Sequence, residues 1–141
     1  MTSRALGRAE AMKLVEGVSL GRIAFTIDAL PAIRPVSHIV DAEGAVILRG
    51  HRGVDGVLKA AADTVVAYSA DAIDPLTYVG WSVTLTGVAQ MIDSPASLAG
   101  FPSIVRPWGP HEQSYVIRVL PEVVTGFELA QRPDELPTGA L

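Results

Sequence analysis

The sequence contains no cysteine in its 141 residues, and it has few charged side chains for its length. Without cysteine the chain has no disulfide, no thiolate metal site and no cysteine nucleophile. Charged residues make up 18% of the chain and apolar residues 49%, a high apolar content for one small domain. A buried subunit interface would cover part of this apolar surface, so the composition predicts an oligomer.

The chain also lacks a strong basic field and any long apolar run. Its formal net charge is −4, which gives no global attraction for nucleic acid. The N-terminal segment is interrupted by charged residues and has no signal-peptide core, and no stretch approaches the length of a membrane span. We therefore expect a cytoplasmic protein that contacts neither membrane nor nucleic acid. Its length predicts one domain over residues 1–141, with a loose tail at 131–141.

Apolar periodicity predicts a chain made mainly of strands. Helical spacing indicates one amphipathic helix over residues 7–17. Period-two alternation and turn residues predict strands over 21–27, 32–40, 45–49, 64–70, 79–92, 113–120 and 122–130. Short helices are expected after Gly53 and near 95–100, and Gly87 indicates a bulge or a bend. This pattern predicts a mainly β fold, a six- to seven-stranded closed or partly closed barrel.

Several motifs that carry chemistry are missing. The sequence has no phosphate-binding Gly-x-x-x-x-Gly-Lys loop, no dinucleotide-binding Gly-x-Gly-x-x-Gly and no His-Glu-x-x-His. Its histidines, His38, His51 and His111, are too scattered to indicate a metal site. Asp71 and Asp74 precede a proline, where aspartate normally caps a turn, so an acid–base pair is disfavoured.

Two segments leave a functional and a structural interpretation equally open. In the segment 33–38, Pro35 indicates an edge or an interrupted pairing. Arg34, Val36 and His38 share one strand face, which is a poor core face and either meets water or meets a ligand. In the segment 49–53, arginines beside glycines at a strand-to-helix junction suit either an anion site or an ordinary surface connection.

The order of these segments carries a family resemblance. The segments that carry it are Gly21-Arg22-Ile23-Ala24-Phe25, Arg34-Pro35-Val36-Ser37-His38, the strand ending at Arg49, and the run from Asp71 to Val83. The more specific parts are Gly80-Trp81-Ser82-Val83 and Val116-Ile117-Arg118-Val119-Leu120-Pro121 with Val124-Thr125-Gly126. Over about residues 5–130 the chain resembles the pyridoxamine 5′-phosphate oxidase-like family of FMN-binding split barrels.

The resemblance implies a homodimer that binds flavin mononucleotide (FMN) in two clefts between its subunits. It implies that the segment Arg34, Pro35, Val36, Ser37 and His38 lies along the isoalloxazine ring. The phosphate would be faced by Arg49 and the loop that follows it, with Gly50, His51 and Arg52. Lys59 would join Arg49, His51 and Arg52 in replacing the charge that the loop lacks at the family's lysine position. Trp81 and Ser82 would approach from the partner subunit, while Arg106 and Trp108 would cover the ring or the substrate.

The chain departs from the family pattern in the phosphate loop. Many members have serine or threonine and then lysine where this chain has Gly50, Val54 and Asp55. The deazaflavin F420, or no cofactor, therefore stands beside FMN as an alternative.

The leading hypothesis is an FMN-dependent oxidoreductase acting on a small-molecule substrate, with the redox chemistry at the ring. The alternatives are a non-catalytic binding protein or carrier for flavin, F420 or haem, and a structural dimer that has lost its ligand. No catalytic acid or base is assigned. Ser37, His38 and Tyr78 are candidates only because they could lie near the ring.

Overall fold

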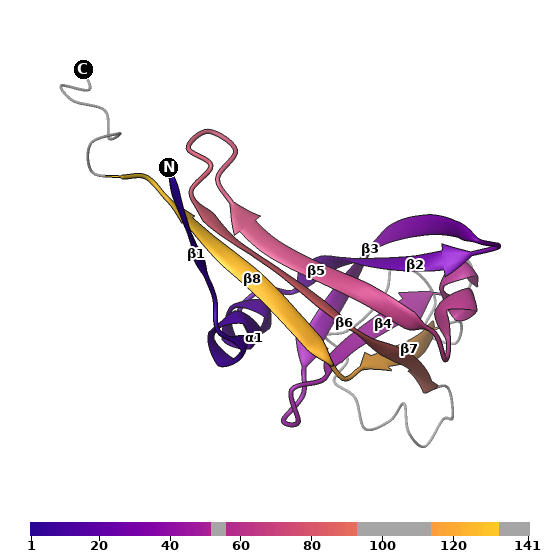
Figure 1. Ribbon diagram of the computed structural model, residues 1–141. Helices are drawn as coiled ribbons and strands as arrows, with labels where there is room; N and C mark the ends of the chain where they lie inside the picture. Colours follow the sequence, from indigo (N-terminus) through magenta and orange to yellow (C-terminus); the bar gives the residue numbers. More distant parts are fainter. Residues whose placement is uncertain (52–55, 93–113, 133–141) are drawn as a thin grey trace.

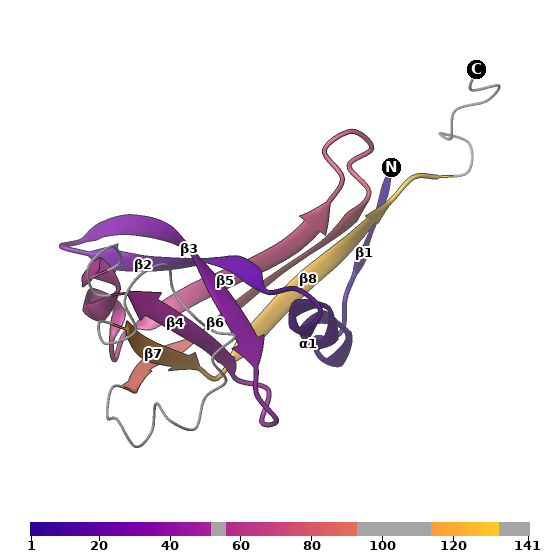
Figure 2. The same cartoon turned by 180° about the vertical axis from the view of Figure 1, so that it is seen from behind.

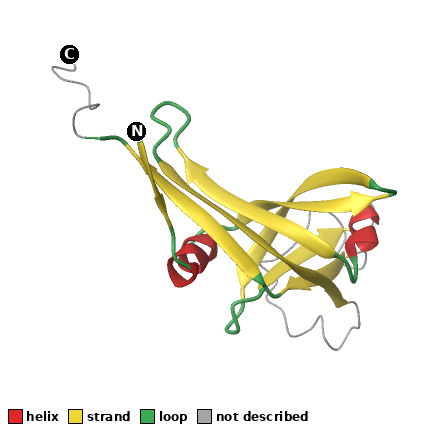
Figure 3. Cartoon of the chain, viewed as in Figure 1, coloured by secondary structure: helices red, strands yellow, loops and turns green. Residues whose placement is uncertain are grey.

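The computed structural model describes residues 1–51, 56–92 and 114–132 (Figure 1). Its elements in chain order are β1 (Thr2–Ala5), α1 (Arg8–Glu16), β2 (Leu20–Ile27), β3 (Leu30–Val40), β4 (Val46–His51), the 3₁₀ helix η1 (Gly56–Ala61), β5 (Val65–Ile73), β6 (Gly80–Ile92), β7 (Ser114–Val119) and β8 (Val123–Ala130). Strands make up most of the described chain, and its helices lie in the connections between strands (Figure 3).

The strands within these residues form one antiparallel sheet in the order β1-β8-β6-β5-β2-β3-β4-β7. An additional pairing of β6 with β7 closes the sheet, so that β6, β5, β2, β3, β4 and β7 form a barrel. β1 and β8 extend the sheet beyond the barrel, which is visible from both sides of the molecule (Figures 1 and 2). The predicted mainly β split-barrel fold is confirmed.

Gly87 lies where β6 changes partner. Up to Thr86 the strand pairs with β8, and from Ala89 it pairs with β7. A Cβ atom at position 87 would lie 2.3 Å from the carbonyl oxygen of Leu120. Only glycine allows this close backbone approach, at the position where the sequence predicts a bulge or a bend.

The barrel interior is filled by the inward-facing residues of the alternating strands. On β2 these are Gly21, Ile23 and Phe25, all buried. α1 packs against one end of the barrel through Ala11 and Val15, which are fully buried. The inward face of β2 therefore agrees with the alternation of the sequence. The end of α1 lies beside the start of β2.

The structure differs from the predicted elements at two places. β1 is not predicted, because its four residues are all exposed and show no apolar alternation. It forms because β8 offers a free edge, with Thr2 opposite Ala130 and Ala5 opposite Phe127. β5 runs on to Ile73, past the predicted end near residue 70, because β6 continues opposite it as far as Gly80. The helix expected near 95–100, the loop expected at 101–111 and most of the expected tail lie outside the described residues.

Candidate functional site

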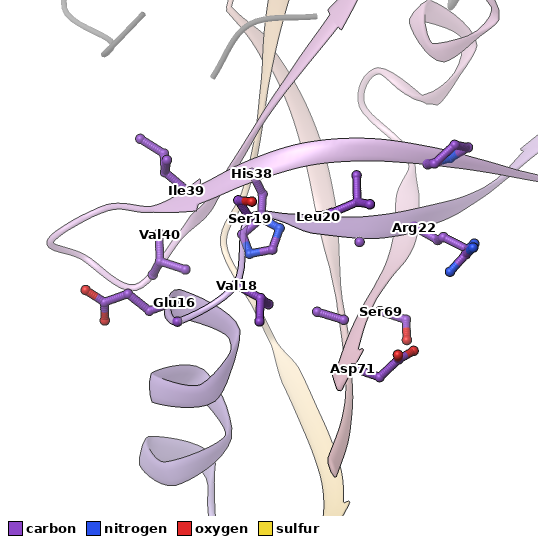
Figure 4. Close-up of a pocket in the computed structure, with 14 residues that line it drawn as sticks. Glu16, Val18, Ser19, Leu20, Arg22, His38, Ile39, Val40, Ser69 and Asp71 are labelled. Carbon is purple, nitrogen blue, oxygen red and sulfur yellow. The ribbon is translucent and has the colours of Figure 1, made fainter. Parts of the chain in front are cut away.

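A groove of about 760 Å³ opens where α1 ends beside the barrel (Figure 4). It is lined by residues 16–22 of the α1–β2 segment, by residue 35 and residues 38–40 of β3, and by residues 69–71 of β5. The groove therefore combines segments that are far apart in the chain, and the pairing of β2 with both β3 and β5 brings them together.

The β2–β3 turn sets which residues face the groove. The turn consists of Asp28 and Ala29, both with positive φ (50° and 65°), and Ile27 lies opposite Leu30. Such two-residue turns match the twist of the flanking strands. The resulting register places Arg22 opposite Pro35 and Leu20 opposite Ser37, on the outer face of the barrel.

Within the described residues, the first part of β3 pairs with a neighbouring strand on one side only, beside the groove. Residues 30–37 pair with β2, whereas the pairs with β4 are formed by residues 38–40. In a hairpin of this type, alternate residues direct their backbone groups away from the partner strand, and here these include Pro31 and Pro35, which have no N–H. Arg34 Nη1 donates a hydrogen bond to the carbonyl of Ile33 at 2.9 Å. The edge or interrupted pairing predicted at Pro35 is confirmed within the described residues, because β4 pairs only with residues 38–40, and prolines disfavour pairing of such an edge with another strand.

His38 lies at the groove with its side chain buried. Its exposed fraction is 2%, and its ring Nε2 donates to the carbonyl oxygen of Val15 at 2.8 Å. Its Nδ1 accepts a hydrogen bond from the hydroxyl of Tyr68. Burial lowers the pKa of His38 and raises the pKa of Tyr68, so the neutral imidazole and the protonated phenol are favoured.

The strand face that holds His38 corrects the prediction from the sequence. Val36 and His38 were expected on a poor core face, but both are buried in the barrel interior, and Val36 belongs to the main core. The polar histidine is accommodated there because Val15 and Tyr68 satisfy both ring nitrogens. The opposite face, with Pro35 and Ser37, faces outward.

The groove collects only part of the predicted cofactor-binding set. Pro35 and His38 line it, whereas Val36 lies in the core and Arg34 bonds to the neighbouring carbonyl. Ser37 is half-buried opposite Leu20.

The other predicted residues lie outside the groove lining. Arg49 is half-buried on β4, where it pairs with Val116 and follows the pair of Leu48 with His38. Gly50 and His51 continue β4, and Lys59 is exposed on η1. Trp81 and Ser82 are half-buried on β6, opposite Ala72 and Asp71 of β5. Arg52, Arg106 and Trp108 lie outside the described residues, as do Val54 and Asp55 of the departing loop.

Of the groove lining, the predicted site residues include only Pro35 and His38, and four of the residues that were missed or set aside lie on the outer face of the sheet. Leu20 and Arg22 lie on the outward face of β2, and Ser69 and Asp71 lie beside them on β5. Asp71 was expected to cap a turn, but it is part of β5; the capping residue is Asp74, whose Oδ1 accepts from the Leu76 N–H at 2.8 Å. The alternation of apolar residues along a strand marks its outward positions, but it does not show which residues of the neighbouring strand lie next to them.

The described residues contain no group of three or more side chains suited to hold a metal ion. Among the helices of this same part of the chain, none has the length and apolarity that a membrane crossing requires. The lining of the groove combines apolar surface with two serines (Ser19 and Ser69), the buried His38, one guanidinium group (Arg22) and two carboxylates (Glu16 and Asp71).

This fold and groove place the chain among the split-barrel proteins, and the comparisons identify the family. Residues 7–129 match the family described as pyridoxamine 5′-phosphate oxidase, so the chain belongs to that family, as the resemblance predicted. The uncharacterized protein Rv0080 of Mycobacterium tuberculosis is 41% identical over 128 residues, covering 88% of this chain and 84% of the relative.

Two solved structures from Mycobacterium smegmatis share the fold. The FAD-binding protein is 28% identical, with a TM-score of 0.69, and the match covers 92% of this chain and 100% of that one. The FAD- and haem-binding protein is 16% identical, with a TM-score of 0.69 over 94% of this chain and 75% of that one. At this identity the second match speaks for the fold alone.

The buried imidazole predicts loss of stability in acid. The pKa of His38 is lowered in the folded state, while in the unfolded chain it lies near 6.5, so the unfolded state takes up the proton first. The stability that neutral His38 provides is complete above about pH 6.5 and is lost as the pH falls from there through the lowered pKa, by at most about 1.4 kcal/mol per pH unit. Denaturant unfolding of the wild type and of His38→Gln at a series of pH values measures this difference. Equal pH slopes for the two proteins would contradict the assignment.

Proposed function

We propose that the protein binds a flavin in the groove and works as an FMN-dependent oxidoreductase on a small-molecule substrate. The observation that carries the proposal is the groove itself, because it joins apolar walls to a guanidinium group on the outer face of a family split barrel. Leu20 and Pro35 offer apolar contact for a ring, and Arg22 lies between Pro35 of β3 and Ser69 of β5. These residues fit a planar ring with an anionic chain.

Arg49 gives this fit a second cation. β3 and β4 pair at His38 and Leu48, so the next residue of β4, Arg49, comes beside Ser37 at the end of the paired segment. Arg49 and Ser37 alternate with the inward residues, which puts both on the outer face. Two guanidinium groups would then lie on either side of the β3 edge, a spacing that suits a ring between them and a phosphate at one end.

A bound flavin would supply hydride or electron transfer at its ring. The chain would supply orientation: Leu20 and Pro35 exclude water from one side of the ring, and Arg22 and Arg49 attract its anionic parts. The FAD-binding protein of Mycobacterium smegmatis, at 28% identity, favours a flavin and makes FAD the principal rival of FMN. F420 remains the alternative on the basis of the sequence at Gly50.

A flavin carrier without turnover is the second candidate function, and His38 favours it. His38 is the buried titratable side chain of the groove lining, and both of its ring nitrogens bond within the protein. A general acid or base needs a nitrogen within reach of the substrate. We therefore propose no acid–base role for His38 in either function.

We further propose that the protein is a homodimer, formed through the outer face of β3, β2, β5, β6 and β8. Two rows of paired residues cross this face: Pro35, Arg22, Ser69, Thr84 and Thr125, and Ile33, Ala24, Ala67, Thr86 and Val123. Arg22 is the single charged residue in these rows, and Ile33 and Val123 are 60% and 55% exposed. Sheet faces of this kind are normally covered.

A second copy fits this face by its charges and by the place of the groove. Arg22 and Asp71 are both exposed on it, and a twofold arrangement can bring Arg22 of one subunit near the acidic residue of the other. The groove opens on the same face, so the second copy would also close it. The net charge of −4 gives no general attraction for nucleic acid or for an anionic membrane, so we propose neither as a partner. We also propose a cytoplasmic location.

Titration of the purified protein with FMN, FAD and F420 tests the proposed function by the visible absorption of each ring. We expect FMN or FAD to bind, and reduction of the bound ring by NAD(P)H under anaerobic conditions would separate an oxidoreductase from a carrier. Arg49→Gln should weaken FMN at least about tenfold, because charge-assisted bonds to phosphate are lost. Riboflavin, which lacks the phosphate, should bind both proteins alike. Absence of binding for all three rings would overturn the proposal.

Thr84→Arg tests the dimer. Thr84 lies in the middle of the strand face, so twofold symmetry would place two new cations close to each other and favour separation of the subunits. Sedimentation at micromolar concentration should show a dimer for the wild type and a monomer for the variant. Ala60→Arg, on the exposed surface of η1, is the matched control and should remain dimeric. A monomeric wild type, or a dimeric Thr84→Arg, would exclude this interface.

A further inference from the structure

His38 and Tyr68 form a buried pair behind the wall of the groove. Their exposed fractions are 2% and 1%, and their rings meet edge to face with centroids 5.1 Å apart. The Tyr68 hydroxyl donates to His38 Nδ1, and His38 Nε2 donates to Val15. The chain of hydrogen bonds thus runs from β5 through β3 to the last turn of α1, across the part of the barrel over which the groove opens.

The rim of the groove is the α1–β2 segment at residues 15–21, and His38 bonds to it at two points. Its ring bonds to the carbonyl of Val15, which also accepts from the N–H of Val18 at 3.3 Å. Its backbone N–H donates to the carbonyl of Ser19 at 2.9 Å. The segment between these bonds, residues 15–19, ends α1 and leads into β2, and residues 16–22 line the groove. One residue therefore fixes both ends of this segment to β3.

Tyr68 packs against the same rim from the barrel interior. A Cβ atom at position 21 would lie 2.4 Å from the Tyr68 hydroxyl oxygen and 2.5 Å from the carbonyl oxygen of Ser69. The absence of a side chain at Gly21 thus lets β2 lie directly against the tyrosine ring. Leu20 and Arg22, on either side of Gly21, line the groove, so Tyr68 contacts β2 at the residue between two groove residues.

We propose that His38 and Tyr68 are positioning residues, whose hydrogen bonds hold the α1–β2 rim at residues 15–21 in the shape that ligand binding in the groove requires. They act through the rim and transfer no proton to the ligand, since both ring nitrogens of His38 are already bonded within the protein. The identity of the ligand rests on the proposed function, whereas the holding of the rim does not.

Three variants of the pair separate positioning from general stability. His38→Leu removes both ring hydrogen bonds at similar volume. His38→Gln retains a donor for Val15 and an acceptor for Tyr68, and Tyr68→Phe removes only the hydroxyl. Val119→Ala, a cavity variant in the core of β7 outside the groove lining, is the control for lost stability.

Amide hydrogen exchange of the full chain without ligand gives the first measurement. The N–H groups of Gly17 and Val18 should exchange at least about tenfold faster in His38→Leu and Tyr68→Phe than in the wild type, relative to the amides of β8. His38→Gln and Val119→Ala should retain the wild-type ratio. If His38→Leu does not fold, Tyr68→Phe decides. A ratio in Tyr68→Phe equal to that of the Val119→Ala control would overturn the proposal.

FMN affinity gives the second measurement. We expect at least about tenfold weaker binding in Tyr68→Phe and His38→Leu, with affinity restored in His38→Gln and unchanged in Val119→Ala. His38→Gln binding as weakly as His38→Leu would contradict positioning by these hydrogen bonds. If the wild type itself binds no FMN, the proposed function fails, and the exchange measurement alone then decides whether the pair holds the rim.

Discussion

The close packing of Tyr68 against Gly21 is the constraint on which the groove depends. A side chain at position 21 would occupy the space of the tyrosine hydroxyl, so β2 could no longer lie against β5 at this point. The same hydroxyl satisfies His38, and His38 in turn fixes the end of α1. A buried polar pair of this kind is favourable only when all its partners are present, because an unpaired buried nitrogen or hydroxyl is costly. The interior of the barrel and the shape of its surface are thereby linked.

The outer face of the sheet, through which we propose that two copies associate, bears on the unusual composition of the chain. Its residues are mostly serine, threonine, alanine and aliphatic side chains, which suit close contact with another sheet face better than contact with water. Arg22 and Asp71 are the charged residues where this face borders the groove, and both line it. In the proposed dimer one face would serve association and ligand binding together, which would account for the high apolar content with only 18% charged residues.

The sequence predicted the strands better than it predicted their surroundings. The alternation of Ile23 and Phe25 with Ala24 located the inward face of β2, because burial leaves a local pattern. β1 left no such pattern, because it forms only where β8 offers an edge. His38 was assigned to a poor core face because its two partners, Val15 and Tyr68, lie 23 and 30 residues away in the chain. Polar residues can enter a core when distant groups satisfy them, and this cannot be read from local spacing.

In the candidate site, too, local features were predictable from the sequence and contacts between distant segments were not. The missing N–H of Pro35, a local property, predicted an edge or an interrupted pairing, whereas its place in a binding site was implied by the family resemblance alone. Arg22, Leu20 and Ser69 were not predicted, because they become neighbours only through the register of β2 with β3 and β5. The family resemblance supplied the fold and the flavin hypothesis, whereas the groove residues came from the pairing of strands.

In the proposed assembly, two copies of this barrel together enclose flavin against the outer face of the sheet. Native mass spectrometry of the protein reconstituted with FMN measures subunit and ligand number at once. The account predicts two chains carrying one FMN each, with loss of the flavin when the chains separate. Single chains that retain FMN, or a dimer that takes up none, would contradict it.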